Sequence, residues 1–365
     1  MRPTIRWTTA LTALLVATGL VAAAVPASAS SRGAGSEGVD AGRITSIVVL
    51  GDSVAAGEGA ADGLTYRNRS LFPGWVADGS GADPAPACGR TDAAYGGRVA
   101  DALGAELTNL ACSGASFARG ITLDDRFDAA RPDLVLVTAG ANSIAFERAY
   151  AYCVLASRGV AASEAEQVVR ASTVGDALVT GLGLAARRAL GRGPAAPDAA
   201  CTADEPGAYL EQTVLARADD VADAARALAL EIRGRGRAAG RVPDIVFTTY
   251  PDPLPEEATG LALCPDGAAI GAAQLAFMHD LVATLNGALR EALADVPGVR
   301  VADPDPAFAG HRWCDPDPWV YGPSIFVTDP QSRAPFHPTP AGQRATAASV
   351  LAALRAVPGE WRGTV

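Results

Sequence analysis

The sequence predicts an α/β fold, a doubly wound parallel sheet of about five strands with helices on both faces. Five short apolar segments predict the strands, because a strand buried on both faces of a parallel sheet is apolar throughout. Segments with helical periodicity separate them, and this alternation is typical of a three-layer domain. The strands are expected at residues 45–51, 106–111, 133–139, 244–250 and 298–303. The helices are expected near residues 92–104, 206–234, 270–296 and 340–356.

The N-terminal residues 1–29 have the features of a secretory signal peptide. Arg2 and Arg6 provide a positive start, residues 10–25 are apolar and uncharged, and residues 27–29 are small enough for cleavage. A membrane anchor is the alternative, but this apolar stretch is short for a span of ~20 residues. We therefore expect a secreted protein with no stable membrane anchor.

The rest of the chain divides into a flexible linker at residues 30–43 and one folded domain at residues 44–365. The formal net charge of the whole chain is −10, and all 30 basic residues are arginine. An acidic surface disfavours nucleic acid as a partner and disfavours electrostatic docking on anionic lipid. We expect a monomer whose partner is its substrate.

Six cysteines in an exported chain predict three disulfides. No CxxC or HExxH motif occurs and the three histidines are far apart, so a metal site is not expected. Six cysteines allow 15 pairings, among which the sequence does not decide. The simplest scheme pairs neighbours along the chain: Cys88 with Cys112, Cys153 with Cys201, and Cys264 with Cys314.

Four motifs stand where parallel sheets bind ligands. Gly51-Asp52-Ser53 ends the first strand, Gly114 and Asn142 follow the second and third strands, and His337 precedes the last helix. The carboxyl ends of parallel strands meet at one edge, so these residues can converge. A serine hydroxyl becomes a nucleophile when a base such as histidine takes its proton, and fixed donors must stabilise the resulting oxyanion. The pattern predicts acyl-transfer chemistry.

With these motifs in this order, most of the mature chain resembles the SGNH hydrolases, also called the GDSL esterase/lipase family. The cysteine placement and the middle section are similar to those of its secreted bacterial branch. The resemblance implies a flavodoxin-like sheet, Ser53 as the nucleophile and His337 as the general base. It also implies an oxyanion hole formed by the backbone N–H groups of Ser53 and Gly114 and the side-chain amide of Asn142. No cofactor is expected.

The sequence departs from the family pattern at two positions. The family usually has Asp three residues before the histidine, where this chain has Ala334. We predict that the backbone carbonyl of Ala334 accepts a hydrogen bond from Nδ1 of His337, which makes a Ser–His dyad. A distant acid that folds back is the alternative: Asp329, Asp317 or Asp315. Ser143 stands where many relatives have Asp, and we expect a supporting role for it.

Three other polar residues have structural interpretations. Asp52 adjoins the serine, so its side chain points away from Ser53, and we expect it to form hydrogen bonds within the loop. His279 lies in an amphipathic helix and is expected to be structural. His311 lies in the loop that leads to His337, where we favour pocket lining or a structural role over catalysis.

Residues 145–205 interrupt the alternation of strands and helices. They are rich in alanine and weakly periodic, and Cys153 and Cys201 stand near their two ends. We interpret them as a helical insertion closed at its base by a disulfide. Two interpretations stay open: a cap over the active site, or packing against the flank of the domain.

The function expected is that of a secreted serine esterase or lipase that hydrolyses carboxylic esters through an acyl-enzyme on Ser53. Its substrate is a small-molecule ester or an ester of a lipid or polymer, and lipid degradation is one such role. Two alternatives stay open. An acyltransferase would use the same site with an alcohol in place of water, and a non-catalytic protein on this fold would bind a glycan or lipid.

Overall fold

A computed structural model describes the chain in several ranges, all within one compact unit, Glu37–Val365. The described residues are 44–60, 65–68, 75–78, 88–144, 146, 149, 216–256, 272–322 and 336–356. The predicted signal peptide and linker, nearly all of the 145–205 insertion, Ala334 and Asp329 lie outside these ranges. No helix in the described ranges is long and apolar enough to cross a membrane.

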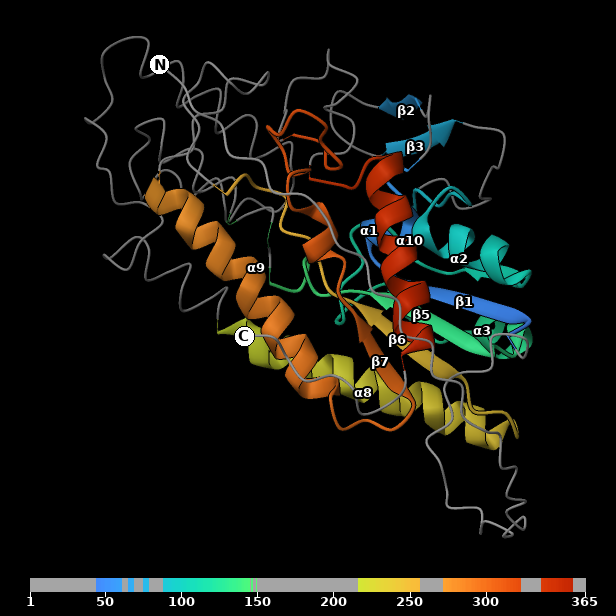
Figure 1. Cartoon of the computed structure of the whole chain (residues 1–365). Coiled ribbons are helices and arrows are strands. Elements are labelled where there is room, and N and C mark those ends of the chain that lie inside the picture. The colour runs from blue at the N-terminus through green and yellow to red at the C-terminus, as the bar shows by residue number, and fades with distance from the viewer. Residues whose placement is uncertain are drawn as a thin grey trace, which may run out of the picture. The chain divides into compact units, whose positions relative to one another are not determined.

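The predicted five-stranded parallel sheet is confirmed (Figure 1). Its strands are β1 (Ser46–Gly51), β4 (Glu106–Asn109), β5 (Leu134–Thr138), β6 (Asp244–Thr248) and β7 (Val299–Ala302). They are ordered β4-β1-β5-β6-β7, and every neighbouring pair is parallel. The strand β1 therefore lies inside the sheet. Strand β4 pairs with it on one side, and β5, β6 and β7 follow in order on the other side.

Alternate residues of the strands bury two separate cores, which makes the domain three-layered. In β1, Val48 and Leu50 belong to the core that includes residues of α8 (Arg217–Ala238) and α9 (Ala272–Leu293). Ile47 and Val49 belong to the core on the other face, formed with residues of α2 (Tyr95–Leu103) and α10 (Pro340–Arg355). This division follows from the two-residue period of a strand. Both faces are covered, so the strands are apolar throughout.

Several short elements were not predicted. They are α1 (Ser53–Ala56), α3 (Asp125–Ala130), the 3₁₀ helix η3 (Asp305–Phe308) and a separate antiparallel pair, β2 (Thr65–Asn68) and β3 (Trp75–Asp78). Elements of four to six residues are too short to show a helical or strand period.

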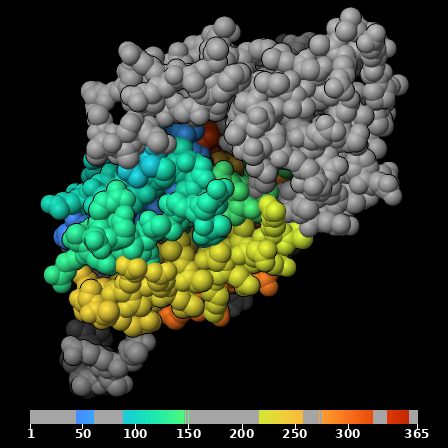
Figure 2. Space-filling model, turned by 180° about the vertical axis from the view of Figure 1, so that it is seen from behind, coloured from blue at the N-terminus to red at the C-terminus, as the bar shows by residue number. Residues whose placement is uncertain are grey.

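Helix α8 runs to Ala238, four residues beyond its predicted end. Within the added turn, a Cβ at Gly236 would lie 2.6 Å from Pro243 Cδ and 2.7 Å from the Arg241 carbonyl oxygen. Glycine therefore serves close packing here rather than termination. Seen from behind, α8 (yellow) lies along the surface beside α3 (Figure 2), and an Arg235–Asp128 ion pair of 3.0 Å joins the two helices.

A disulfide joins Cys88 to Cys112, as in the sequential scheme. It connects the loop after β4 to the segment before α2. Cys314 is disulfide-bonded as well. The remaining cysteines lie outside the described ranges, so the other two predicted pairs stay predictions.

Candidate active site

The carboxyl ends of the strands meet at one edge of the sheet and position the predicted site there. Ser53 follows β1, Gly114 follows β4, Asn142 follows β5, and Tyr250 follows β6. This is the edge at which doubly wound sheets bind ligands. The last participant, His337, comes from the segment just before α10.

Local geometry presents the Ser53 hydroxyl at a sharp turn from strand to helix. A side chain at Gly51 is excluded, because its φ is +133° and a Cβ would lie 2.0 Å from the Thr138 carbonyl oxygen. Asp52 caps α1 by accepting a hydrogen bond from the Val54 N–H at 3.0 Å. Gly57 then ends α1 in the left-handed conformation, which glycine adopts without strain.

Ser53 and His337, 284 residues apart in the chain, are in hydrogen-bond contact. The distance from Ser53 Oγ to His337 Nε2 is 2.6 Å. His337 is buried, and a short antiparallel pairing fixes its backbone: Tyr321 N–H donates to the His337 carbonyl at 3.0 Å, and Phe336 N–H donates to the Tyr321 carbonyl at 3.1 Å. Thr339 then caps α10, and Pro340 begins it.

Gln343 connects the helix that follows His337 to the helix that carries Ser53. Its side-chain oxygen accepts from Tyr95 N–H at 2.8 Å, and its amide donates to the Val54 carbonyl at 3.3 Å. The side chain is fully buried. Sequence analysis missed this residue. Gln343 stands seven residues, or about two helical turns, before the buried Val350, so both lie on the buried face of α10, and this spacing could have indicated Gln343.

Unpaired N–H donors lie in the segments that follow β1 and β4. Within the described ranges, the backbone N–H groups of Ser53 and Gly114 donate to no acceptor. Gly114 has a φ of +76°, and no atom lies within 4 Å of the position of a Cβ there. Asn142 uses one amide N–H to bond the Ala115 carbonyl at 2.9 Å, which leaves its second N–H for another acceptor. Ser143 Oγ accepts from Phe117 N–H at 3.2 Å and so links these two loops.

Asp52 is buried behind the serine, away from the solvent. Tyr250 donates its hydroxyl hydrogen to Asp52 Oδ2 at 2.5 Å, and the Ala141 N–H donates to the Tyr250 oxygen at 3.2 Å. Burial raises the pKa of Asp52 to about 6, although the hydrogen bond from Tyr250 opposes the shift. Burial and the nearby Asp52 charge raise the pKa of Tyr250 well above its ordinary value. Asp52 thus forms loop hydrogen bonds, and Tyr250 is a partner that sequence analysis missed.

The other two histidines are engaged elsewhere. His279 Nδ1 bonds Asp252, and its Nε2 faces the Pro255 carbonyl oxygen at 3.1 Å. His311 Nδ1 donates to the Asp317 carbonyl at 2.8 Å, and its ring stacks on Trp319 with centroids 3.8 Å apart. These contacts tie His279 of α9 to the loop after β6 and hold His311 within its own loop, so both histidines have structural contacts.

The two alternative acids that the structure describes bond within their own loop. Asp315 accepts from Arg312 N–H at 2.6 Å, and Asp317 Oδ2 accepts from Trp319 Nε1 at 3.3 Å. The proposed acceptor at Ala334 and the third acid, Asp329, lie outside the described ranges.

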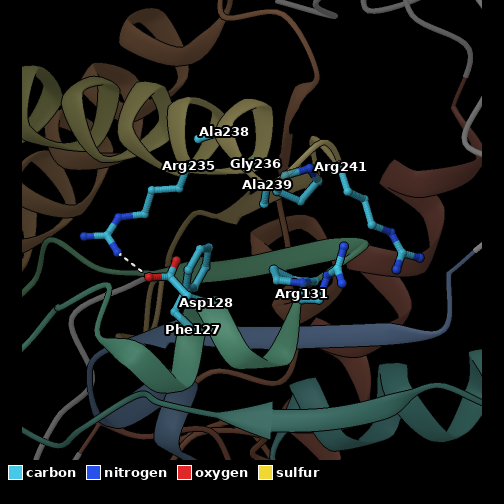
Figure 3. Close-up of a pocket in the computed structure, with 10 residues that line it drawn as sticks. Phe127, Asp128, Arg131, Arg235, Gly236, Ala238, Ala239 and Arg241 are labelled. Carbon is cyan, nitrogen blue, oxygen red and sulfur yellow. Dashed lines mark hydrogen bonds and ion pairs between the residues drawn. The ribbon is translucent and has the colours of Figure 1, made fainter.

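A hollow of about 360 Å³ lies at the opposite edge of the sheet, bordered by residues just before β5 and β6 (Figure 3). Three arginines contribute to its lining, but Arg235 is paired with Asp128 and Arg241 with Asp133. It contains none of the residues around Ser53. In the described part of the chain, no three His, Cys, Asp or Glu side chains are grouped so that they could hold a metal ion.

A serine hydroxyl in contact with a histidine is the nucleophile–base arrangement found in serine hydrolases. Residues 49–345 match the model of the GDSL-like Lipase/Acylhydrolase family. The match spans most of the chain, and the protein therefore belongs to this family.

Comparisons with individual proteins are less specific. The structure is similar to that of phospholipase A1 from Streptomyces albidoflavus, with 19% identity over 85% of this chain and 99% of that chain and a TM-score of 0.50. An extracellular lipase from Streptomyces rimosus matches with 20% identity over the same shares and a TM-score of 0.49. At such identities the likeness to the phospholipase supports the fold alone. No protein with a curated description matches the sequence.

Proposed function

We propose that this protein is a secreted serine esterase or lipase that hydrolyses carboxylic esters, with Ser53 as nucleophile and His337 as general base. The observation that carries the proposal is the 2.6 Å contact between Ser53 Oγ and His337 Nε2 at the carboxyl edge of the sheet. That distance lies within the range required for a serine to pass its proton to a base. Secretion rests on the signal-peptide features of residues 1–29.

The reaction proceeds in two half-reactions. Ser53 Oγ attacks the ester carbonyl carbon while its proton passes to His337 Nε2. The carbonyl oxygen becomes negative and accepts from the N–H groups of Ser53 and Gly114 and from the remaining amide N–H of Asn142. The C–O bond to the alcohol breaks, and the alcohol leaves with the proton from Nε2. Water then attacks the acyl carbon and gives a proton to His337 Nε2. The bond from the acyl carbon to Ser53 Oγ breaks, Nε2 returns the proton to Oγ, and the acid is released.

His337 must present Nε2 to the serine, which requires the proton of the neutral ring on Nδ1. We propose that the backbone carbonyl of Ala334 accepts that proton in a hydrogen bond. The side chain at position 334 has no acceptor, and Asp315 and Asp317 are bonded elsewhere. Both facts favour a dyad over a triad.

An aromatic pair beside His337 supports an ester with an apolar part. The rings of Phe336 and Phe146 meet edge to face, with centroids 6.1 Å apart. Phe336 is the residue directly before His337, so apolar surface adjoins the catalytic base. This surface suits an acyl chain, and we propose a carboxylesterase or lipase of broad specificity.

The test is hydrolysis of p-nitrophenyl esters from acetate to palmitate by the wild type, Ser53→Ala and His337→Ala, with and without a chelator. Turnover by the wild type, with both variants inactive and the chelator harmless, supports the proposal, and the preferred chain length separates esterase from lipase. Activity retained by Ser53→Ala contradicts it. A wild type inert on every ester also contradicts it and favours the binding protein. Formation of a new ester when an alcohol is added would identify a transferase.

A further inference from the structure

The carboxylate of Glu58 contacts the candidate catalytic histidine on the side that faces the serine. Glu58 Oε2 lies 3.3 Å from His337 Nε2, the same nitrogen that contacts Ser53. The Glu58 and His337 side chains are only 6% and 10% exposed. Glu58 is therefore a buried acid next to the atom that would receive and return the proton.

The backbone directs this side chain inward. Glu58 N–H donates to the Ser53 carbonyl at 3.0 Å, which fixes Glu58 to the end of the nucleophile helix. Gly59 has a φ of +77°, and a Cβ there would lie 2.7 Å from the Tyr321 ring and 2.9 Å from the Pro338 carbonyl oxygen. Tyr321 also donates its hydroxyl hydrogen to the Gly59 carbonyl at 3.3 Å. The position of Glu58 is thus determined by the same segments that hold Ser53 and His337.

A glycine, Gly89, packs against the Glu58 side chain. A Cβ at Gly89 would lie 3.4 Å from Glu58 Cγ and 2.9 Å from Ser113 Oγ. Gly89 adjoins Cys88, whose disulfide holds this segment against the loop after β4. Position 89 also has a φ of +64°, which favours glycine, and a side chain there would crowd Ser113 while it contacts Glu58.

Burial of a carboxylate is costly unless a positive charge or donors compensate it. Among the residues that the structure describes, the ion-pair partner of Glu58 is His337. That partner is fully charged only after it takes the serine proton. The compensation is therefore greatest in the transition state and the tetrahedral intermediate, which is the condition for an interaction to accelerate a reaction.

The residue three positions before His337 carries no charge. In a triad, an acid on the Nδ1 side stabilises the imidazolium, whereas position 334 here is alanine. We propose that Glu58 supplies negative charge on the Nε2 side of the ring, and stabilises the imidazolium form of His337 during acyl transfer. This inference rests on the proposed function.

Proton transfer stays balanced in this scheme. The proton moves from Ser53 Oγ to His337 Nε2 and from there to the leaving alcohol, and Glu58 takes no proton in either step. The new Nε2–H lies between Ser53 Oγ and Glu58 Oε2, so the glutamate accepts only a weak, shared hydrogen bond. Asp52 also acts on His337 through its charge, but its oxygens are bonded to Tyr250 and Val54, so it stays the same in Glu58 variants.

The test compares kcat/KM from pH 5 to 10 for the wild type, Glu58→Gln and Glu58→Asp, with p-nitrophenyl butyrate as substrate. Glu291→Gln, the same change at an exposed helix position, is the control. Glu58→Gln keeps the shape and removes the charge. We expect its plateau kcat/KM to fall roughly tenfold to a hundredfold, mainly in kcat, because one fixed charge is lost from the transition state. The acidic limb of the profile moves to lower pH, because the neutral histidine no longer faces a negative charge.

Each result decides between alternatives. Glu58→Asp keeps the charge and should retain more activity than Glu58→Gln, while Glu291→Gln should match the wild type. A Glu58→Gln profile equal to the wild type overturns the inference while the proposed function stands. A loss of activity with an unmoved acidic limb and a lowered Tm also overturns it, since that is a structural effect. If Glu58→Gln does not fold, Glu58→Asp decides: its shorter side chain withdraws the carboxylate from His337 Nε2, so kcat should fall and the acidic limb should move part of the way to lower pH. An Asp variant equal to the wild type in both would then overturn the inference. An inert wild type means instead that the proposed function has failed.

Discussion

Two histidines of this protein lie beside buried carboxylates, and they differ in what their ring nitrogens face. His337 Nε2 contacts the Ser53 hydroxyl at 2.6 Å, with Glu58 at 3.3 Å. His279 is held between Asp252 on Nδ1 and the Pro255 carbonyl on Nε2. Both partners of His279 are acceptors, so the ring makes both bonds only with hydrogen on both nitrogens. That form has no lone pair with which to take a proton.

The carboxylates of the two regions differ as well. Asp252 also lies 3.5 Å from the guanidinium of Arg312, so a permanent cation faces it. This cluster links the loop after β6 to α9 and to the loop after β7. Within the described ranges, the ion-pair partner of Glu58 is the histidine, whose full charge arises during the reaction. The same residue types therefore build a permanent crosslink in one region and a site poised for proton transfer in the other.

The largest expected effect is the difference in kcat between a variant without the His337 ring and a variant without the His279 ring. His337→Ala should lower kcat by ~10⁴-fold or more with little change in Tm, because it removes the base. His279→Ala should leave kcat within about threefold, since its ring makes only structural contacts. Ester hydrolysis and thermal melts of both variants provide the measurements. Comparable losses of kcat in the two variants would contradict the assignment of His337 as the base and His279 as structural.

The next effect concerns stability. Asp252→Ala leaves Arg312 and His279 without their shared carboxylate, so the free energy of unfolding should fall by about 2–3 kcal/mol. Urea denaturation at pH 7 measures it. Asp280→Ala, an exposed position next to His279 on α9, is the matched control and should change stability by less than about 0.5 kcal/mol. Equal stability of the two variants would show that the cluster is not a crosslink.

Asp52 provides a third contrast, because hydroxyl and N–H donors bond its buried oxygens instead of a cation. Its pKa is raised from 3.8 to about 6, so the folded state holds the proton more tightly than the unfolded state. Stability should therefore decrease as the pH rises from about 4 to about 6, and then level off. Asp52→Asn removes this dependence and should gain up to about 3 kcal/mol relative to the wild type at pH 8.

Urea denaturation of the wild type and Asp52→Asn at pH 4, 6 and 8 measures this difference. A difference that does not grow with pH would mean that Asp52 does not titrate in this range in the folded protein. Hydrolysis by the variant reports separately whether the charge of Asp52 also matters for catalysis.

The smallest effect is expected at His311. Its partly exposed ring stacks on Trp319, and its Nδ1 contacts Asp317 through the backbone carbonyl at 2.8 Å and through Oδ2 at 3.4 Å. His311→Ala should cost less than about 1 kcal/mol of stability and change kcat/KM by less than about threefold. A loss of kcat/KM near that of His337→Ala would place His311 in the reaction instead.

The sequence predicted the sheet well because its strands are buried on both faces and separated by long helices. The short helices α1 and α3 could not be predicted, because each makes only one or two turns and shows no helical periodicity in its sequence. The serine and histidine could be predicted because each stands in a recognisable motif at the end of a regular element. Glu58 could not, because a glutamate between two glycines in a loop has the pattern of an exposed turn.

By itself, the sequence determined the fold class and brought the candidate residues to one edge of the sheet, because strand burial and chain order suffice for both. Only the tertiary structure decided the partners of the polar side chains. Glu58 points inward because Tyr321 and Pro338, more than 260 residues further along the chain, confine Gly59 beside it. Gln343 and Tyr250 likewise act through contacts with distant segments. Hydrogen bonds and charges act over a few ångströms in space, and no local sequence pattern records those distances.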